Sequence, residues 1–153
     1  MSNTHQIQIT EEGLQRLKAQ LKELVDVKRP KVVDRLATAR AMGDLSENND
    51  YAQAKDELSF LDGQIAELEE VVRNAIVTKK QNNGTIVLGS KVTVKNSGEH
   101  VFHIVGEWEA DPMQKLISHK SPLGQSLMGK KVGEKAEFEA PAGKITYTIL
   151  KVE

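Results

Sequence analysis

Apolar and small residues recur at alternating spacings of three and four residues through much of the first half of this 153-residue chain. The longest run has these members: Tyr51, Ala54, Leu58, Leu61, Ile65, Leu68, Val72 and Ala75. A run upstream has the same spacing: Leu14, Leu17, Leu21 and Leu24. Such a heptad pattern places one narrow apolar stripe along a helix, as in coiled coils. The sequence therefore predicts two long helices that pack along that stripe.

The first helix is expected to run from about Thr10 to about Met42. Thr10 is a good N-cap, and Glu11 and Glu12 suit the positive end of the helix dipole. The apolar pattern shifts register near Pro30 and resumes through Val33, Leu36 and Ala39–Arg40. Because an interior proline removes a hydrogen bond and bends a helix, we expect one continuous but bent helix.

A short connection separates the two helices. Gly43 is expected to end the first helix as a left-handed glycine, and the second helix is expected to begin at Asp44. So short a connection forces an antiparallel hairpin. Residues 15–40 hold eight basic and three acidic side chains, whereas residues 43–72 hold nine acidic and one basic, which favours this pairing. About 30 residues per helix would make a rod about 45 Å long.

The second half has the pattern of short strands. A polar stretch at 78–83 predicts a linker between a hairpin domain at 1–77 and a small domain at 84–153. Alternating apolar residues predict strands around a turn at 96–98 and a second hairpin at 135–152. A short helix is expected at Pro122–Met128. Four or five antiparallel strands with one helix make a small α+β domain, in which Trp108 is expected to be a core residue.

Composition excludes several classes of function. The net charge is −1 and the pI is about 6.4, so no overall basic field indicates nucleic-acid binding. The absence of cysteine excludes disulfides and thiolate chemistry. No apolar run approaches the roughly 20 residues that span a bilayer, and the amino terminus lacks a signal pattern. We therefore expect a soluble, intracellular protein.

Acidic residues cluster at the end of the predicted hairpin. Asp44, Glu47 and Asp50 are spaced three apart, and would share one face of a helix that begins at Asp44. One interpretation is structural, with Asp44 as N-cap and Glu47 as its capping-box partner. The other is that the carboxylates form half of a magnesium site completed by a partner, since magnesium is often held by only one or two protein carboxylates. The two interpretations are compatible.

Other candidate residues carry less information. Arg40 and Lys55 flank the acidic cluster, and either contact phosphates or form a solvated face in which they pair with Asp56 or Glu57. The segment 124–131 imitates a phosphate-binding loop but lacks its final Ser or Thr and lies within and after a helix. His100 and His103 are three apart in an expected strand, so they point to opposite faces and are poorly placed to share a metal.

Two segments of the chain contain longer motifs. The first segment lies at the hairpin end, is followed by Ala54-Lys55, and reads Arg40-Ala41-Met42-Gly43-Asp44-Leu45-Ser46-Glu47-Asn48-Asn49-Asp50-Tyr51. The second segment reads Ile117-Ser118-His119-Lys120-Ser121-Pro122-Leu123-Gly124, followed by Leu127-Met128-Gly129-Lys130-Lys131-Val132-Gly133. Both segments resemble the GreA-type transcript cleavage factors of bacteria, and the resemblance covers essentially the whole chain in the same order.

The resemblance implies a particular fold and partner. The fold would be α+β, with an antiparallel coiled-coil hairpin and a carboxy-terminal FKBP-like domain. The partner would be bacterial RNA polymerase, whose secondary channel the hairpin enters to stimulate cleavage of backtracked nascent RNA. Asp44 and Glu47 match tip acids that help to hold a magnesium ion of the polymerase. Arg40 and Lys55 match positions associated with the RNA, and Ser121 and Pro122 fall in a segment used against polymerase.

The resemblance also sets what the isolated chain is expected not to do. It would hydrolyse nothing alone, bind no magnesium tightly, take no small-molecule substrate, contact no membrane, and act as a cytoplasmic monomer. Two alternatives stay open. A protein of the same fold could enter the channel and inhibit the polymerase without cleavage, and the fold analogy alone suggests a prolyl isomerase.

Overall fold

The computed structural model describes residues 6–43, 48–79 and 83–153, and these form two compact units. One unit is Gln15–Asn74, a helical hairpin. The other combines the described residues up to Leu14 with those from Ala75 onward, and is built around β-sheets. The fold is thus α+β, as the sequence predicts. The linker and domain boundaries expected at residues 77 and 84 stay predictions.

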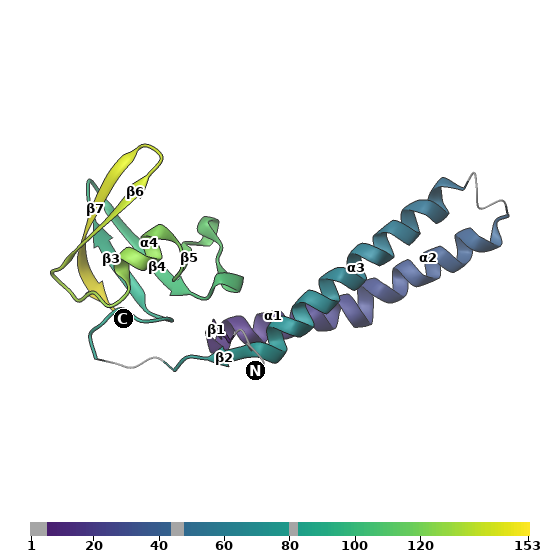
Figure 1. Ribbon diagram of the computed structural model, residues 1–153, viewed down its shortest axis with the longest axis horizontal. Helices are drawn as coiled ribbons and strands as arrows, with labels where there is room; N and C mark the ends of the chain where they lie inside the picture. The colour runs from purple at the N-terminus through teal and green to yellow at the C-terminus, as the bar shows by residue number, and fades with distance from the viewer. Residues whose placement is uncertain (1–5, 44–47, 80–82) are drawn as a thin grey trace, which may run out of the picture. The chain divides into compact units, whose positions relative to one another are not determined.

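The hairpin consists of two antiparallel helical stretches. The first stretch is helical without interruption through α1 (Glu11–Glu23), η1 (Leu24–Lys28) and α2 (Arg29–Ala41), and the second is α3 (Asn49–Asn74) (Figure 1). Ion pairs join them in antiparallel order, with 2.7 Å from Arg29 Nε to Asp62 Oδ1 and 2.8 Å from Arg35 Nη1 to Glu57 Oε2. The predicted pairing of a basic helix with an acidic one is confirmed.

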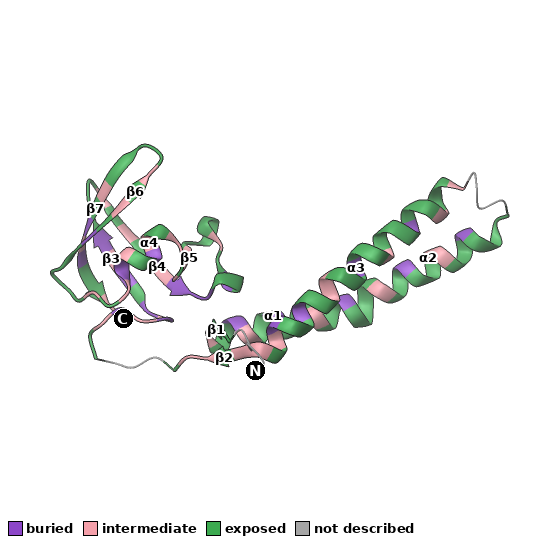
Figure 2. Ribbon diagram, in the orientation of Figure 1, coloured by how far each residue is buried: buried purple, intermediate pink, exposed green. Residues whose placement is uncertain are grey.

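The buried seam follows the predicted spacing except near the proline and at the end of α3, where Val71 is 2% exposed and the expected Val72 is only partly buried. Ala54, Leu61 and Leu68 of α3 are buried, as expected from the heptads. On α2, however, Val32 is 5% exposed and Val33 is 38% exposed, so the seam expected at Val33 runs through Val32. Figure 2 shows such buried residues recurring one at a time along the helices, with exposed surface between them.

A π-helical turn explains this shift of register. In η1 the N–H of Arg29 donates to the carbonyl of Leu24, five residues earlier, in place of the α-helical four. The turn therefore holds one residue more than an α-helical turn. Seven residues beyond the buried Leu24 lies Lys31, and the additional residue moves the seam to Val32 instead.

Both ends of α3 differ from the prediction. The helix begins at Asn49, not at Asp44, because Asn48 is not helical and caps the first turn. The helix ends at Asn74, so Ala75, expected as the last seam residue, belongs instead to the strand β2 (Ala75–Val77). β2 pairs in parallel with β1 (Ile7–Ile9), which the sequence pattern did not predict.

The main sheet has five strands within the described residues, in the order β5-β4-β3-β7-β6. The predicted hairpins are confirmed: β3 (Lys91–Lys95) pairs with β4 (Glu99–Val105), and β6 (Lys135–Ala140) pairs with β7 (Gly143–Val152), both antiparallel. The expectation of a wholly antiparallel sheet is wrong, because β5 (Leu116–Ser118) runs parallel to β4. The short turns η2 (Glu107–Glu109) and η3 (Pro112–Gln114) provide the crossover that a parallel pair requires.

One face of this sheet holds the core of the unit. The short helix α4 (Pro122–Leu127) contributes Leu127 to it, and strands β3, β4 and β7 contribute Val92, Val94, Phe102, Ile104, Tyr147 and Ile149. Trp108, expected in this core, is 38% exposed, because it lies in η2 beyond the end of β4.

A buried carboxylate ties the start of α1 to the turn after β4. Glu109 is 8% exposed and accepts hydrogen bonds from the backbone N–H of Thr10 at 3.0 Å, from the Thr10 hydroxyl, and from the N–H of Gly106 at 2.8 Å. Thr10 in turn accepts from the N–H of Gly13 at 3.1 Å, so the predicted N-cap is confirmed. A side chain at Gly13 would collide with the Glu109 carboxylate, which explains a glycine inside a helix.

Candidate functional site

Each helix of the hairpin has a defined end beside the connection. Helix α2 ends at Ala41, and Gly43 has a φ of +112°, a left-handed conformation that confirms its predicted role in ending the helix. On the other side, the Asn48 amide donates to the carbonyl of Ala39 at 2.8 Å, and its oxygen accepts from the N–H of Tyr51 at 3.1 Å. Asn48 therefore caps α3 and fastens it to α2.

Asn48 belongs to this candidate site, although the sequence patterns did not predict its role. Asparagine is among the strongest N-cap residues, and an acidic residue, Asp50, follows in the first turn. That signal was present, but the acidic residues upstream offered an equally good cap. Only the contact with Ala39 distinguishes Asn48 from them.

The predicted tip acids lie outside the described residues. Asp44 directly follows Gly43 and Glu47 directly precedes Asn48, so both belong to the connection between α2 and α3. Asp50, the third acid of the cluster, is described. Its Oδ1 lies 3.6 Å from Nε of Arg35, in an ion pair across the hairpin. Because α3 begins at Asn49, the argument that placed all three acids on one helical face no longer applies.

The two predicted RNA-contact residues are both exposed near the connection. The Arg40 guanidinium carbon lies 5.9 Å from the centroid of the Tyr51 ring, a cation–π contact between α2 and α3. Lys55 forms no ion pair with any residue for which the structure gives a position. Its possible partner Glu57 binds Arg35 instead. Arg40 is therefore oriented by a ring, and Lys55 is available to an external anion.

Among the described residues of the hairpin, Arg29 has a pKa shifted from its ordinary value. The hydrogen bond with Asp62, and secondly the charge of that carboxylate, raise the pKa of Arg29. A raised pKa for a base means that the charged guanidinium contributes stability below its unfolded-state pKa, and that this contribution declines as pH rises through its folded-state pKa. Since arginine is charged throughout the physiological range, no pH dependence near neutrality follows from it.

The predicted partner-binding residues Ser121 and Pro122 begin α4. The Ser121 hydroxyl accepts from the N–H of Gly124 at 3.1 Å and donates to the carbonyl of Ser118 at 2.7 Å. The hydroxyl is thus occupied by the fold, whereas Pro122 is exposed. A side chain at Gly124 would collide with that same Ser118 carbonyl, so this glycine permits close packing instead of forming a phosphate-binding loop.

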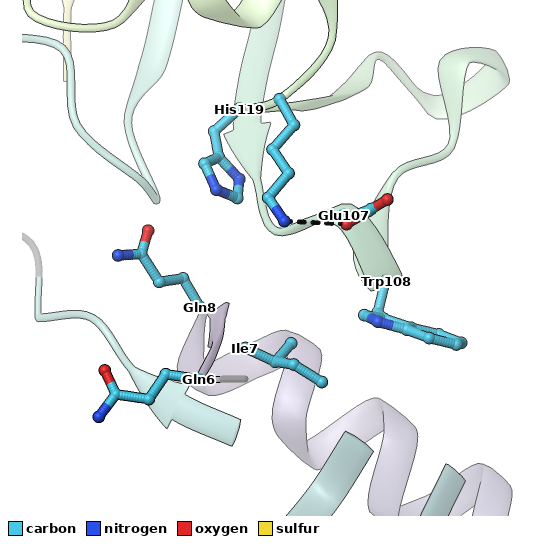
Figure 3. Close-up of a pocket in the computed structure, with 7 residues that line it drawn as sticks. Gln6, Ile7, Gln8, Glu107, Trp108 and His119 are labelled. Atoms are coloured by element: carbon cyan, nitrogen blue, oxygen red, sulfur yellow. Dashed lines mark hydrogen bonds and ion pairs between the residues drawn. The ribbon is translucent and has the colours of Figure 1, made fainter. Parts of the chain in front are cut away.

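A cavity of about 450 Å³ lies beside this segment, within the same unit. Figure 3 shows Gln6, Ile7 and Gln8 of the amino-terminal segment on one side, with Glu107, Trp108 and His119 on the other. Lys120 completes the lining and pairs with Glu107 at 3.3 Å. The imidazole Nδ1 of His119 lies 3.3 Å from the carbonyl of Val105. The lining offers polar and aromatic contacts to a partner.

The part of the chain that the structure describes contains no group of three or more acidic or histidine side chains placed to bind a metal ion. His100 stacks on Phe102, with ring centroids 6.0 Å apart, and is therefore part of the aromatic packing of the sheet. Across the same described ranges, no helix combines the length and the apolarity that crossing a membrane requires.

A helical hairpin fastened by Asn48 beside an acidic connection, combined with a small sheet unit, defines an α+β protein. Comparison with known protein families gives matches to two family models. Residues 7–77 match the family model "Transcription elongation factor, N-terminal", and residues 80–153 match "Transcription elongation factor, GreA/GreB, C-term". The chain belongs to the GreA/GreB family of transcription elongation factors.

Curated relatives agree over the whole length. The chain is 45% identical over 150 residues to the transcription elongation factor GreA of Bacillus anthracis, covering 95% of each chain. It is 41% identical over 158 residues to GreA of a Bacillus cereus strain, covering all of both chains, and 44% identical over 154 residues to GreA of Lactococcus lactis subsp. cremoris, covering 95% and 96%. The resemblance inferred from the two segments is confirmed, and these relatives do not favour the inhibitory alternative.

Among solved structures, GreA factor homolog 1 (Gfh1) of Thermus thermophilus matches with 24% identity and a TM-score of 0.47, covering 97% of this chain and 99% of that one.

Proposed function

We propose that this chain binds bacterial RNA polymerase, enters its secondary channel, and stimulates the polymerase's own cleavage of backtracked nascent RNA. Family membership supports the class of function. The observation that carries the mechanism is the acidic connection: Asp44 and Glu47 lie between Gly43 and Asn48, at the end of the hairpin. Cleavage would return an RNA end to the active centre and rescue arrested complexes in the cytoplasm.

The hairpin is suited to carry carboxylates into a confined site. Helix α3 has 26 residues, and at about 1.5 Å per residue it is roughly 39 Å long. Two helices side by side are narrow enough for a channel that excludes a globular domain. The clamp formed by Asn48 would present Asp44 and Glu47 without fraying of the first turn of α3. We also propose that the two helices pack as a coiled coil and that the sheet unit has an FKBP-like fold.

The carboxylates of Asp44 and Glu47 suit a hard divalent cation, since carboxylate oxygens are ligands that magnesium prefers. The magnesium ion of the polymerase would activate water and stabilise the leaving oxygen in phosphodiester hydrolysis. Asp44 and Glu47 would contribute oxygen ligands and a hydrogen-bond acceptor for the attacking water. The chain itself would be no enzyme, because the phosphodiester and the remaining ligands belong to the partner.

Other residues would position the complex. Arg40, oriented by Tyr51, and Lys55, which pairs with no described residue, would bind phosphates of the nascent RNA. Pro122 and its exposed surroundings would contact the polymerase. Since the Ser121 hydroxyl is occupied within the fold, its contribution would be to begin α4 correctly. We propose that the chain acts as a monomer, with neither a membrane nor a small-molecule substrate as a partner.

The decisive experiment uses stalled elongation complexes with end-labelled RNA. The wild-type chain should shorten the RNA, and Asp44→Asn and Glu47→Gln should each reduce the cleavage rate at least about tenfold, because each removes one anionic ligand. Affinity for polymerase should be unchanged. The matched control is Asp56→Asn, an exposed acid further along α3, which should behave as the wild type.

Two results would contradict the proposal. One is equal cleavage by the wild type and both tip variants. The other is slowed RNA extension without shortening by the wild-type chain, which would indicate the inhibitory alternative.

A further inference from the structure

A large aromatic side chain is exposed on the helical hairpin. Phe60 of α3 is 68% exposed, whereas the other two phenylalanines, Phe102 and Phe138, pack in the core of the sheet unit. Most of the apolar surface of this side chain is therefore in contact with water, which is unfavourable. A single exposed apolar residue is common and would carry no inference alone. Its surroundings give it significance.

Phe60 lies at the edge of a groove of about 480 Å³ between the two helical stretches. Leu61 and Gln64 line it from α3, and Val32 and Arg35 line it from α2, with Lys28, Lys31 and Glu57 completing the set. Val32 and Leu61 are buried residues of the seam and form an apolar floor. The π-helical turn shapes this groove, because it moves Val32 into the seam and leaves Lys31 exposed.

The cations of the groove belong to the basic helical stretch of residues 15–40 and lie beside the acidic helix α3. The groove lining contains three cations and one carboxylate, a net charge of +2, on a hairpin whose second half holds nine acidic residues and one lysine over residues 43–72. The Arg35 guanidinium is held by Glu57 and Asp50. Lys28 and Lys31 form no ion pair with any of the residues the structure places. Two exposed ammonium groups therefore flank an apolar depression.

This combination favours a protein segment over a nucleic acid. Lys28 and Lys31, which pair with no described residue, suit one or two carboxylates, whereas a longer strand of phosphates would extend past them along the acidic helix α3. The apolar floor suits an aliphatic or aromatic side chain as an anchor. We propose that this groove, the Phe60 groove, binds an acidic protein segment that inserts one apolar side chain against Phe60, Val32 and Leu61. Resting on the proposed function, we assign that segment to RNA polymerase.

Affinity of the full-length chain for core RNA polymerase tests this inference. Phe60→Ser should weaken binding about tenfold, because the anchor contact is lost. Phe60→Leu should restore affinity to within about twofold, because it keeps an apolar side chain. The matched control is Val33→Ser, which changes an exposed apolar residue of α2 outside the groove. Since Phe60 is mostly exposed, the unfolding midpoint of Phe60→Ser should match that of the wild type.

A charge-reversal pair tests the acidic character of the segment. The double variant Lys28→Glu/Lys31→Glu should weaken binding about tenfold or more and reduce the dependence of affinity on salt. The control double variant Lys18→Glu/Lys22→Glu makes the same change in net charge on exposed positions of α1, and should retain affinity within about threefold. Because the chain has no cysteine, Gln64→Cys also provides a single site for a photoreactive label. This label should crosslink to an acidic stretch of polymerase.

Several results would overturn the inference. Equal affinity of Phe60→Ser and the wild type for polymerase would do so, as would crosslinking of the Gln64→Cys label to RNA alone. So would a self-association of the wild type, seen by sedimentation velocity, that Phe60→Ser abolishes. Failure of the proposed function is distinguishable, because a wild type that binds polymerase through Phe60 yet shortens no RNA contradicts cleavage and leaves the groove supported. A wild type that does not bind polymerase overturns both.

Discussion

The hairpin and the sheet unit differ in how their side chains are buried. In the hairpin, buried residues are spaced singly along one seam, and most of each helix faces solvent (Figure 2). In the sheet unit, Ile104, Leu127 and Ile149 are almost completely buried within one continuous cluster. A narrow seam leaves much of the surface of both helices exposed to solvent, whereas a clustered core stabilises a compact unit. The two units therefore differ in how their stability is distributed.

The strongest test of this comparison is a cavity in the sheet core. Ile104→Ala should lower the free energy of unfolding of the sheet unit by about 3 kcal/mol, because the residue is fully buried among apolar neighbours. Native-state hydrogen exchange should show the loss in β3, β4 and β7 and leave α3 protection unchanged. Ile76→Ala, at an exposed residue of β2, serves as the control and should cost less than about 1 kcal/mol. Equal loss of protection in α3 would contradict the separation of the two regions.

The Glu109 contacts should give the next largest effect. Glu109→Gln replaces a buried carboxylate that accepts three hydrogen bonds with an amide that has only one acceptor oxygen, and should destabilise the sheet unit by about 2 kcal/mol. Urea denaturation measures the change. The control is Glu107→Gln, whose partner Lys120 is exposed, and this variant should fall within about 0.5 kcal/mol of the wild type. A similar loss in both variants would show that the buried hydrogen bonds contribute little.

A smaller effect is expected at the hairpin end. Asn48→Ala removes the cap of α3 and its contact with Ala39, and should destabilise the hairpin by about 1 kcal/mol. Hydrogen exchange at the first amides of α3 should accelerate, and transcript cleavage should fall because Glu47 is the preceding residue. Asn49→Ala, one residue further on and exposed, is the matched control. Unchanged exchange at Tyr51 in the Asn48 variant would mean that the cap is unimportant.

The smallest effect is expected for the exposed ion pairs across the hairpin. Glu57→Gln should change stability by less than about 0.5 kcal/mol, because both partners are well solvated. A double-mutant cycle with Arg35→Gln, measured at low and high salt, gives the coupling energy. A coupling that is large and insensitive to salt would show that the charged surface, and not the seam, holds the helices together.

Local signals in the sequence predicted much of this molecule correctly. The heptads of α3, the glycine at position 43, the threonine cap of α1, the serine at the start of α4 and both antiparallel hairpins all depend on residues close to one another along the chain. The roles of Asp44 and Glu47 came from a family pattern, and family membership is confirmed, although both acids lie outside the described residues. Arg40 and Lys55 lie as exposed cations near the hairpin end, and whether they contact RNA stays a prediction.

Other features depended on contacts between distant residues. The additional residue in η1 placed the seam at Val32, where the sequence pattern predicted Val33, and β1 paired with β2 while β5 paired in parallel with β4. Glu109, 99 positions from Thr10, became a buried cap that no nearby motif indicates. Spacing and turn residues are local properties that a sequence displays directly. The choice of partner and of register depends on which distant surfaces bury each other, and only the folded chain decides that.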